Sequence, residues 1–247
     1  MLGFADSRPL NLVIPLKQAR AIAKHLDITT CGELLQYYPR RYLQYGKGAD
    51  LTGMEEGSTA TIIGTVVSTT LIPNRKTPKR PIFRIEVDDG RQTIPATFFG
   101  SAYAQRMLRE GRRVMLNGKL NFFRGRPQLQ HPDFVLLDGT SQATGSLKQL
   151  MHFGSLEHIL SGRDWLPIYP AKKGINTWTI MGAVHMVLHS LAAIEEPLGF
   201  TPIGMLPLNS AVRQIHEPGP EGPGKALHRL KYDEACLLYT SPSPRDG

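Results

Sequence analysis

The stretch PIFRIEVDDGRQTIPATFFGSAY (81–103) holds two strand patterns, a tight turn and the beginning of a helix. In residues 81–90, apolar side chains alternate with polar ones, which is the period of a strand with one buried face. Asp89-Gly90 is a typical turn between antiparallel strands, and residues 92–99 supply the partner strand. We therefore expect a β-hairpin here, followed by a short helix.

The segments on either side of this hairpin predict a small β-barrel. Further strands are predicted at 58–72, 112–123 and 126–137, and a helix at 101–111. Three strands, a helix and two more strands follow one another in this order in the OB-fold, a five-stranded barrel that often binds oligonucleotides. Gly64 and Gly118 lie inside predicted strands, where glycine often marks a bulge or a sharp bend.

Two adjacent aromatic residues end the hairpin. Neighbours in a strand point to opposite faces, so Phe98 and Phe99 cannot both enter the same core. Tyr103 adds a third ring at the start of the predicted helix. One ring therefore needs a partner outside the core, unless all three pack together under the helix.

The rest of the chain is predicted to be mostly helical. Residues 16–26 have apolar side chains at helical spacing, and Thr30 with Glu33 forms a capping box for a second helix that Pro39 ends. These two helices predict an N-terminal helical hairpin. After a polar linker, an extended segment and three helices are predicted at 165–170, 176–194, 207–218 and 221–235.

These patterns together predict an α+β protein. We expect a helical N-terminal segment (1–45), a five-stranded OB-fold β-barrel (46–140) and a mostly helical linker segment (141–235). The last residues, CLLYTSPSPRD (236–246), match the translation of a common transposase sequencing adapter. We therefore expect coding sequence to end at Ala235, and residues 236–247 to be an artefact without helical structure.

Charge favours an acidic partner. The 247 residues carry a net charge of +8, and residues 71–126 hold thirteen Lys and Arg against four Asp and Glu. Such a basic segment with scattered aromatics is typical of a nucleic-acid surface, although a solvated basic face would have the same composition. The chain has no apolar run long enough for a membrane helix, no secretory signal and only two cysteines. We expect a cytoplasmic protein.

Six stretches in order resemble the N-terminal part of the RecG family of bacterial ATP-dependent DNA helicases. The resemblance runs from about Leu16 to Ala235, and it implies that residues 141–235 hold the linker and the start of the helicase domain. It rests on GELLQYYPRRY (32–42), ATFFGSAY (96–103), GRRVMLNGKLNFFRGRPQLQHPDF (111–134), LPIYPAKKGINTWTI (166–180), AVRQIHEP (211–218) and RLKYDEA (229–235).

The resemblance implies a function on branched DNA. In that family the barrel is a wedge that parts the strands at replication forks and Holliday junctions during repair and recombination, and a motor that uses ATP and Mg²⁺ drives it. It implies that Phe99 and Tyr103 stack on exposed bases while Phe98 fills the core. It also implies phosphate contacts from the basic residues of two barrel loops: Arg75, Lys76, Lys79, Arg80, Arg124 and Arg126. We expect a monomer.

Two features depart from the family. The N-terminal hairpin has Pro15 or Leu16 where the family usually has glycine, and the chain has no phosphate-binding loop, since residues 219–227 have the wrong spacing. We therefore expect no catalytic residue and no cofactor within this chain, which alone should be inactive as an ATPase.

Other functions remain open on the sequence alone. His185 and His189 are four residues apart, as zinc ligands can be, but no third ligand is evident, so we interpret them as surface histidines and expect no metal. The alternative to a helicase fragment is a stand-alone OB-fold protein that binds single-stranded nucleic acid. A further alternative is an interaction module with no nucleic-acid role.

Overall fold

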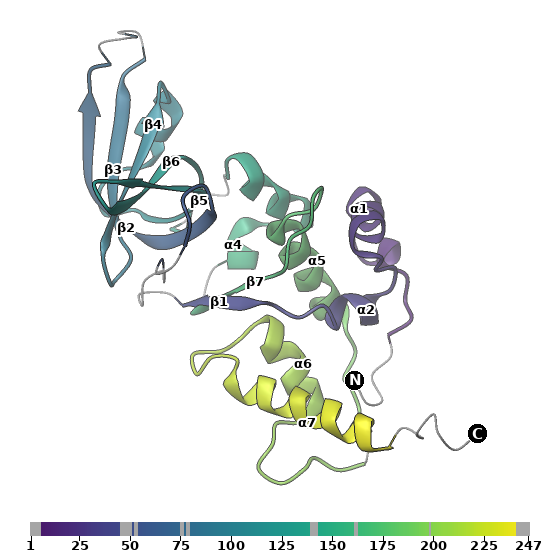
Figure 1. Ribbon diagram of the computed structural model, residues 1–247. Coiled ribbons are helices and arrows are strands. Elements are labelled where there is room, and N and C mark those ends of the chain that lie inside the picture. Colours follow the sequence, from purple (N-terminus) through teal and green to yellow (C-terminus); the bar gives the residue numbers. More distant parts are fainter. Residues whose placement is uncertain are drawn as a thin grey trace. The chain divides into compact units, whose positions relative to one another are not determined.

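The computed structural model describes residues 6–44, 51, 54–74, 77, 80–138, 143–160, 163–197 and 199–240 (Figure 1). Its elements in chain order are η1 (Leu10–Leu12), α1 (Leu16–Leu26), α2 (Cys31–Leu35), β1 (Arg41–Gln44), β2 (Thr59–Ile72), β3 (Ile82–Asp88), β4 (Thr93–Phe99), α3 (Ala102–Met107), β5 (Arg113–Phe123), β6 (Arg126–Leu136), η2 (Gly145–Phe153), α4 (Leu156–Leu160), β7 (Trp165–Ile168), α5 (Thr177–Ser190), α6 (Leu208–His216) and α7 (Gly224–Thr240).

The chain forms two compact units. One contains Met1–Tyr42 together with Arg163–Gly247, and the other contains Leu43–Gly162. This division differs from the three consecutive segments expected from the sequence. The reason is that α1 and α2 pack against α5, which follows the barrel in the chain, while η2 packs against the barrel strand β6.

The Leu43–Gly162 unit is built on a closed five-stranded barrel. The strands are hydrogen-bonded in the order β2-β3-β4-β6-β5, and β5 closes the ring by pairing with β2. All neighbours are antiparallel except β4 and β6. The predicted order of three strands, a helix and two strands is confirmed, with α3 between β4 and β5.

The barrel interior is filled by the inward residues of each alternating strand. Every strand contributes fully buried aliphatic side chains. Ala104 of α3 and Leu108, which follows this helix, are also fully buried in the core. Central members of this core are Ile62, Ile85, Ile94, Leu116, Leu129, Ala104 and Leu108. The alternation visible in residues 81–99 therefore marks the inside and outside of the barrel correctly.

Two strand glycines allow the barrel to close. Gly118 lies where the β5–β6 register shifts between Asn117 and Lys119, as expected for a bulge, and a Cβ there would lie 2.8 Å from Pro132 Cβ. Gly64 has no bulge at its own position; instead, a Cβ on it would lie 2.2 Å from the carbonyl oxygen of Asp88 on β3. A side chain at either position would push neighbouring strands apart.

The other unit is a helical assembly around α5. The capping box of α2 is confirmed, because the Glu33 amide donates to Thr30 Oγ1 at 3.3 Å and the Thr30 amide donates to Glu33 Oε2 at 3.0 Å. Most of α5 is buried, including Trp178. β1 pairs with β7 in a small two-stranded sheet. Among the described residues, no helix is both long and apolar enough to cross a bilayer.

Buried hydrogen bonds connect distant parts of this unit. His216 is buried at the end of α6, and its Nε2 donates to the Leu35 carbonyl of α2 at 2.9 Å. A carbonyl can only accept, so Nδ1 is left to accept from the Tyr169 hydroxyl, also at 2.9 Å. Burial lowers the pKa of His216 from 6.5 to about 4, so the ring is neutral at pH 7.

A second buried network holds α7. The Arg229 guanidinium is almost fully buried and donates to Glu196, to Asp233 and to the Leu206 carbonyl. Glu196 also accepts from the Leu208 amide at the start of α6 at 2.7 Å. The network therefore attaches α7 to the segment that joins α5 to α6.

The expectation that no helix extends past Ala235 is wrong for Cys236–Thr240, because α7 continues to Thr240. The residues 236–240 contain no proline or glycine, and the first helix-breaking residue is Pro242. Residues 241–247 lie outside the described part of the chain.

We predict that Gly64→Ala destabilises the protein by about 1–3 kcal/mol, because the new methyl group would meet the Asp88 carbonyl inside a closed barrel. Gly219→Ala is the matched control, since a Cβ at Gly219 meets no atom within 4 Å, and its effect should stay within about 0.5 kcal/mol. Urea unfolding of both variants measures the difference. Equal stabilities would contradict the close approach at Gly64.

We also predict that acid destabilises the protein through His216. Its pKa is lower in the folded state than in the unfolded state, so its contribution is complete above pH 6.5 and is lost as the pH falls toward 4. Between pH 7 and pH 5 the unfolding free energy should fall by about 2 kcal/mol from this group. His216→Gln should remove this part of the pH dependence, and His152→Gln, at an exposed histidine, should retain it.

Candidate nucleic-acid interface

Phe98 and Phe99 diverge at the end of β4, as strand alternation predicts. Phe98 is 2% exposed, and its ring lies 6.2 Å from that of Phe83 and 6.0 Å, edge-on, from that of Phe134. Phe99 is 41% exposed and pairs with Ile82 across the β3–β4 ladder. Phe98 is therefore a core residue, and Phe99 presents an aromatic ring to solvent.

Tyr103 is in an intermediate position. Its ring stacks on Phe134 with centroids 5.8 Å apart, and it packs against the barrel core. The Arg106 guanidinium lies 5.7 Å from the centre of the ring. Tyr103 is half-buried, so part of this ring is accessible to solvent and part belongs to the barrel core.

Arg80 is the basic residue that the structure places beside Phe99. Gly100 follows Phe99 with a φ of +62°, and a Cβ there would lie 3.1 Å from Arg80 Cγ. The Arg80 side chain thus runs along the backbone just after Phe99, and Arg80 is exposed. The other three candidates from this loop, Arg75, Lys76 and Lys79, lie outside the described residues.

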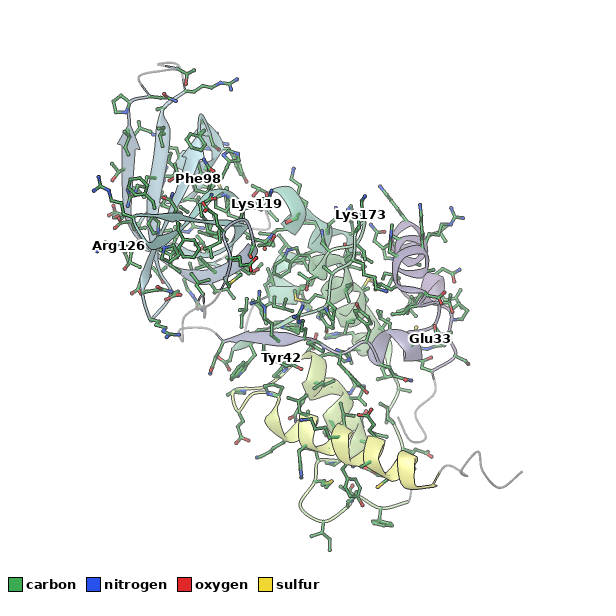
Figure 2. All side chains as sticks on the ribbon, viewed as in Figure 1. Glu33, Tyr42, Phe98, Lys119, Arg126 and Lys173 are labelled. Carbon is green, nitrogen blue, oxygen red and sulfur yellow. The ribbon has the colours of Figure 1, made fainter. Side chains whose placement is uncertain are left out.

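Arg124 and Arg126 are at the opposite end of the barrel strands. In the parallel β4–β6 pair, Thr97 is the partner of Gln130. Phe99 follows this pair by two residues, whereas Arg126 precedes it by four. The offset along the strands is roughly 20 Å. In Figure 2 the labelled Phe98 and Arg126 likewise lie in different parts of the barrel. The predicted site residues therefore form two groups.

Two exposed aromatics lie next to Arg124 and were not predicted from the sequence. Phe122 is 39% and Phe123 is 61% exposed, and the Arg124 guanidinium lies 5.4 Å from the centre of the Phe123 ring. Among the described residues, the segment 121–128 forms ladder pairs only within the β5–β6 hairpin. Its tip therefore extends beyond the barrel wall. Two adjacent aromatics before an Arg-Gly turn were the signal in the sequence.

Some of the basic residues of the barrel are neutralised and others are not. Arg84 pairs with Glu86 at 3.3 Å, and Arg112 pairs with Asp138 at 2.8 Å. Several exposed cations of the barrel unit have no ion-pair partner within the described residues, and Arg80, Lys119, Arg124 and Arg126 are among them. The barrel thus combines exposed rings with available positive charge at both groups.

The interpretation of His185 as a surface residue is wrong, because it is buried; only His189 is exposed. Folding brings a third possible ligand, Glu217, whose Oε1 lies 2.7 Å from His185 Nδ1, and the donor atoms of the three residues lie within 4.8 Å of one another. However, Arg163 also donates to Glu217 Oε1, at 2.5 Å. This guanidinium opposes a cation at the same place, so we interpret the cluster as an ion-pair network.

The charge of Glu217 supports this interpretation. Burial alone would raise the pKa of the Glu217 carboxyl, but the hydrogen bond from His185 and the charge of Arg163 together hold it at about 2. The carboxylate is therefore ionised and paired at neutral pH.

Comparison with known proteins finds a match to the RecG wedge domain family over residues 15–190. The chain is 31% identical to the ATP-dependent DNA helicase RecG of Mycobacterium tuberculosis (strain H37Rv), covering 93% of this chain and 33% of that protein. It is 32% identical to the protein of the same name from Mycobacterium leprae, covering 96% of this chain and 34% of that one. The chain thus spans about a third of the length of these relatives.

A solved structure of RecG bound to a three-way DNA junction has a similar fold. The TM-score is 0.54 at 22% sequence identity, over 95% of this chain and 30% of that chain.

We predict that Phe98→Ala lowers the free energy of unfolding by about 3–5 kcal/mol, because it empties a large site in the barrel core. Phe99→Ala should cost less than about 1 kcal/mol, since the ring already contacts water over much of its surface. Chemical denaturation of the two variants provides the comparison. Similar losses would show that both rings belong to one core cluster.

Proposed function

The chain belongs to the RecG wedge domain family, and on this basis we propose that it binds branched DNA as the strand-separating part of an ATP-dependent DNA helicase. The proposed substrates are replication forks and Holliday junctions, and the proposed role of the whole protein is their remodelling in repair and recombination. The observation that carries the proposal is the exposed Phe99 ring beside Arg80 at the end of a rigid barrel strand.

Stacking on an exposed ring suits a junction. Where two strands part, the last base loses its neighbour, and an aromatic face can replace that neighbour whatever the base is. Such a stack contributes roughly 1–3 kcal/mol per base. We assign this role to Phe99. Tyr103, whose ring is already stacked on Phe134, would contribute its accessible edge.

Basic residues at both ends of the barrel would hold the DNA backbone. Contacts from Lys and Arg to phosphates position a protein on DNA without reading the base sequence, and they weaken as salt increases. We assign this role to Arg80 beside Phe99, to Arg75, Lys76 and Lys79 of the same predicted loop, and to Arg124 and Arg126 at the hairpin tip. We add Phe123 to the tip group, because its exposed ring carries Arg124 beside it.

The separation of these groups fits a wedge. A strand held near Phe99 and a strand held at the β5–β6 tip would lie roughly 20 Å apart along the barrel. A rigid barrel between two strands keeps them from pairing again. The strand order and the position of α3 support our proposal of an OB-fold, a fold with loops that commonly bind oligonucleotides.

The alternative of a stand-alone single-strand-binding barrel is less well supported. The family match extends over residues 15–190, which include helices that precede and helices that follow the barrel in the sequence. A protein that only bound single strands would have no need of these helices in the same order.

Enzymatic activity belongs to the whole protein in this proposal. Its relatives are named ATP-dependent DNA helicases, which implies ATP and Mg²⁺ in the motor that moves the DNA. We propose that the present chain contributes DNA binding and no ATP hydrolysis of its own, since its sequence has no loop that could hold nucleotide phosphates. We further propose a cytoplasmic monomer.

Phe99→Ala tests the proposal. We expect the affinity for a three-way DNA junction to fall about 5- to 150-fold, which corresponds to the loss of one stacked base. Phe123→Ala should have an effect of the same kind at the tip. Fluorescence anisotropy with a labelled junction at fixed salt measures both. Phe200→Ala is the matched control, because Phe200 is also an exposed phenylalanine but lies in the other compact unit.

The proposal would be overturned in two ways. If Phe99→Ala and Phe200→Ala bind the junction with the same affinity, Phe99 does not stack on a base. A wild-type protein that binds a single strand more tightly than the junction would favour the stand-alone alternative.

A further inference from the structure

Five exposed cations gather on the helical unit. Lys17, Arg20 and Lys24 are exposed on α1, and Lys172 and Lys173 are exposed in the turn that follows β7. We call these five residues the α1 patch. Both elements belong to the same compact unit, and Figure 2 labels Lys173 in this region.

Helical geometry aligns the three cations of α1. Residues 17, 20 and 24 are three and four positions apart, so they form one stripe along the helix surface. The opposite side of α1 is buried through Gln18, Ala19, Ile22 and Leu26. The stripe extends over roughly 10 Å, at 1.5 Å per residue. Because the buried side fixes the orientation of the helix, the cations have to face solvent.

The turn that carries Lys172 and Lys173 packs closely against α1. The turn is closed by two backbone hydrogen bonds between Lys172 and Ile175, at 3.0 and 3.2 Å. Gly174 at its tip has a φ of +97°, and a Cβ there would lie 2.3 Å from Cε1 of His25. The glycine backbone therefore rests directly against the His25 ring near the end of α1. The two lysines flank this contact and extend the stripe.

No acidic group of these two segments offsets this charge. The sequence has no Asp or Glu in residues 7–26 or in residues 165–194. Asp27 follows α1 at its C-terminal cap, and Glu33 is engaged by the amides of Thr29 and Thr30. Within the part of the chain that the structure describes, none of the five cations has an ion-pair partner.

We propose that the α1 patch binds the phosphate backbone of a duplex DNA arm. The patch elements contain no Phe, Tyr or Trp, and the His25 ring is packed against Gly174, so the patch is suited to phosphates. A duplex presents one negative charge per 1.7 Å of its axis, twice the charge density of one of its strands. A rigid stripe of cations matches this rigid row of charges. The proposal rests on the proposed function, in which the substrate has duplex arms.

An anionic membrane surface is the competing partner, because Leu12 and Leu16 are exposed at the N-terminal end of the stripe. Leu16 precedes Lys17 and lies one helical turn before Arg20. Lys24 and the two lysines of the turn continue away from the leucines, as expected for contact with a polyanion and not for insertion of an apolar face.

The test compares three double variants of the 247-residue chain that lose the same charge. Lys17→Gln/Lys24→Gln changes the stripe, and Lys172→Gln/Lys173→Gln changes the turn. Lys148→Gln/Lys231→Gln is the control, because both of its lysines are exposed but lie on η2 and α7. The affinity of each for a labelled 30-base-pair duplex is measured across a series of salt concentrations.

We expect each patch variant to reduce the slope of log affinity against log salt by about 2, since each phosphate contact contributes about 0.9. The control variant and Phe99→Ala should keep the wild-type slope. Patch variants with the slope of the control would overturn the proposal. So would a wild-type protein that fails to bind the duplex, or one that binds vesicles rich in phosphatidylserine but no duplex.

The outcomes for the patch and for the proposed function are distinguishable. If the protein prefers a junction, Phe99→Ala abolishes this preference and both patch variants keep the wild-type salt slope, the proposed function is supported and the role of the α1 patch is overturned. If duplex binding depends on the patch but the protein shows no preference for a junction, the role of the α1 patch is supported and the proposed function is overturned.

Discussion

The closure of the barrel is the constraint on which the proposed interface depends. Once β5 pairs with β2, every strand has an inside and an outside, and successive side chains must alternate between them. Phe98 then enters the core, and Phe99, one residue later, is held outside on a strand that cannot rotate. Closure in turn requires Gly64 and Gly118, where any side chain would separate neighbouring strands. A stiff barrel is also what a wedge between two DNA strands needs, because a deformable one would let the strands pair again.

The helical unit depends on buried polar contacts instead. His216 and Arg229 each connect elements that are far apart in the chain, through hydrogen bonds that water cannot replace. Such buried polar groups are costly when a partner is missing, so they specify one arrangement of α2, α6 and α7. Helix α1 then has a single orientation, with its apolar side against the unit and its lysines and arginine in solvent.

Charge shows how far a count along the sequence can mislead. The excess of basic residues in residues 71–126 marks the barrel as a candidate interface, although part of that charge is neutralised by Glu86 and Asp138. The α1 patch is invisible to such a count. Its two parts are about 150 residues apart in the chain, and the acidic residues of the C-terminal segments balance them in the total. Only the packing of Gly174 against His25 brings the five cations together.

Local patterns in the sequence were sufficient for the elements and their order. Residue alternation, turn types and the capping box act over two to five residues, and they predicted the barrel strands, α3, α1 and α2, together with the opposite orientation of Phe98 and Phe99. The tertiary structure decided the rest: the union of residues 1–42 with 163–247, the burial of His185, the free hairpin tip with Phe123 and the α1 patch. The physical reason is the range in sequence over which each kind of interaction acts. A periodic pattern states which side of an element is apolar, but which element covers that side depends on contacts between residues that the sequence leaves far apart.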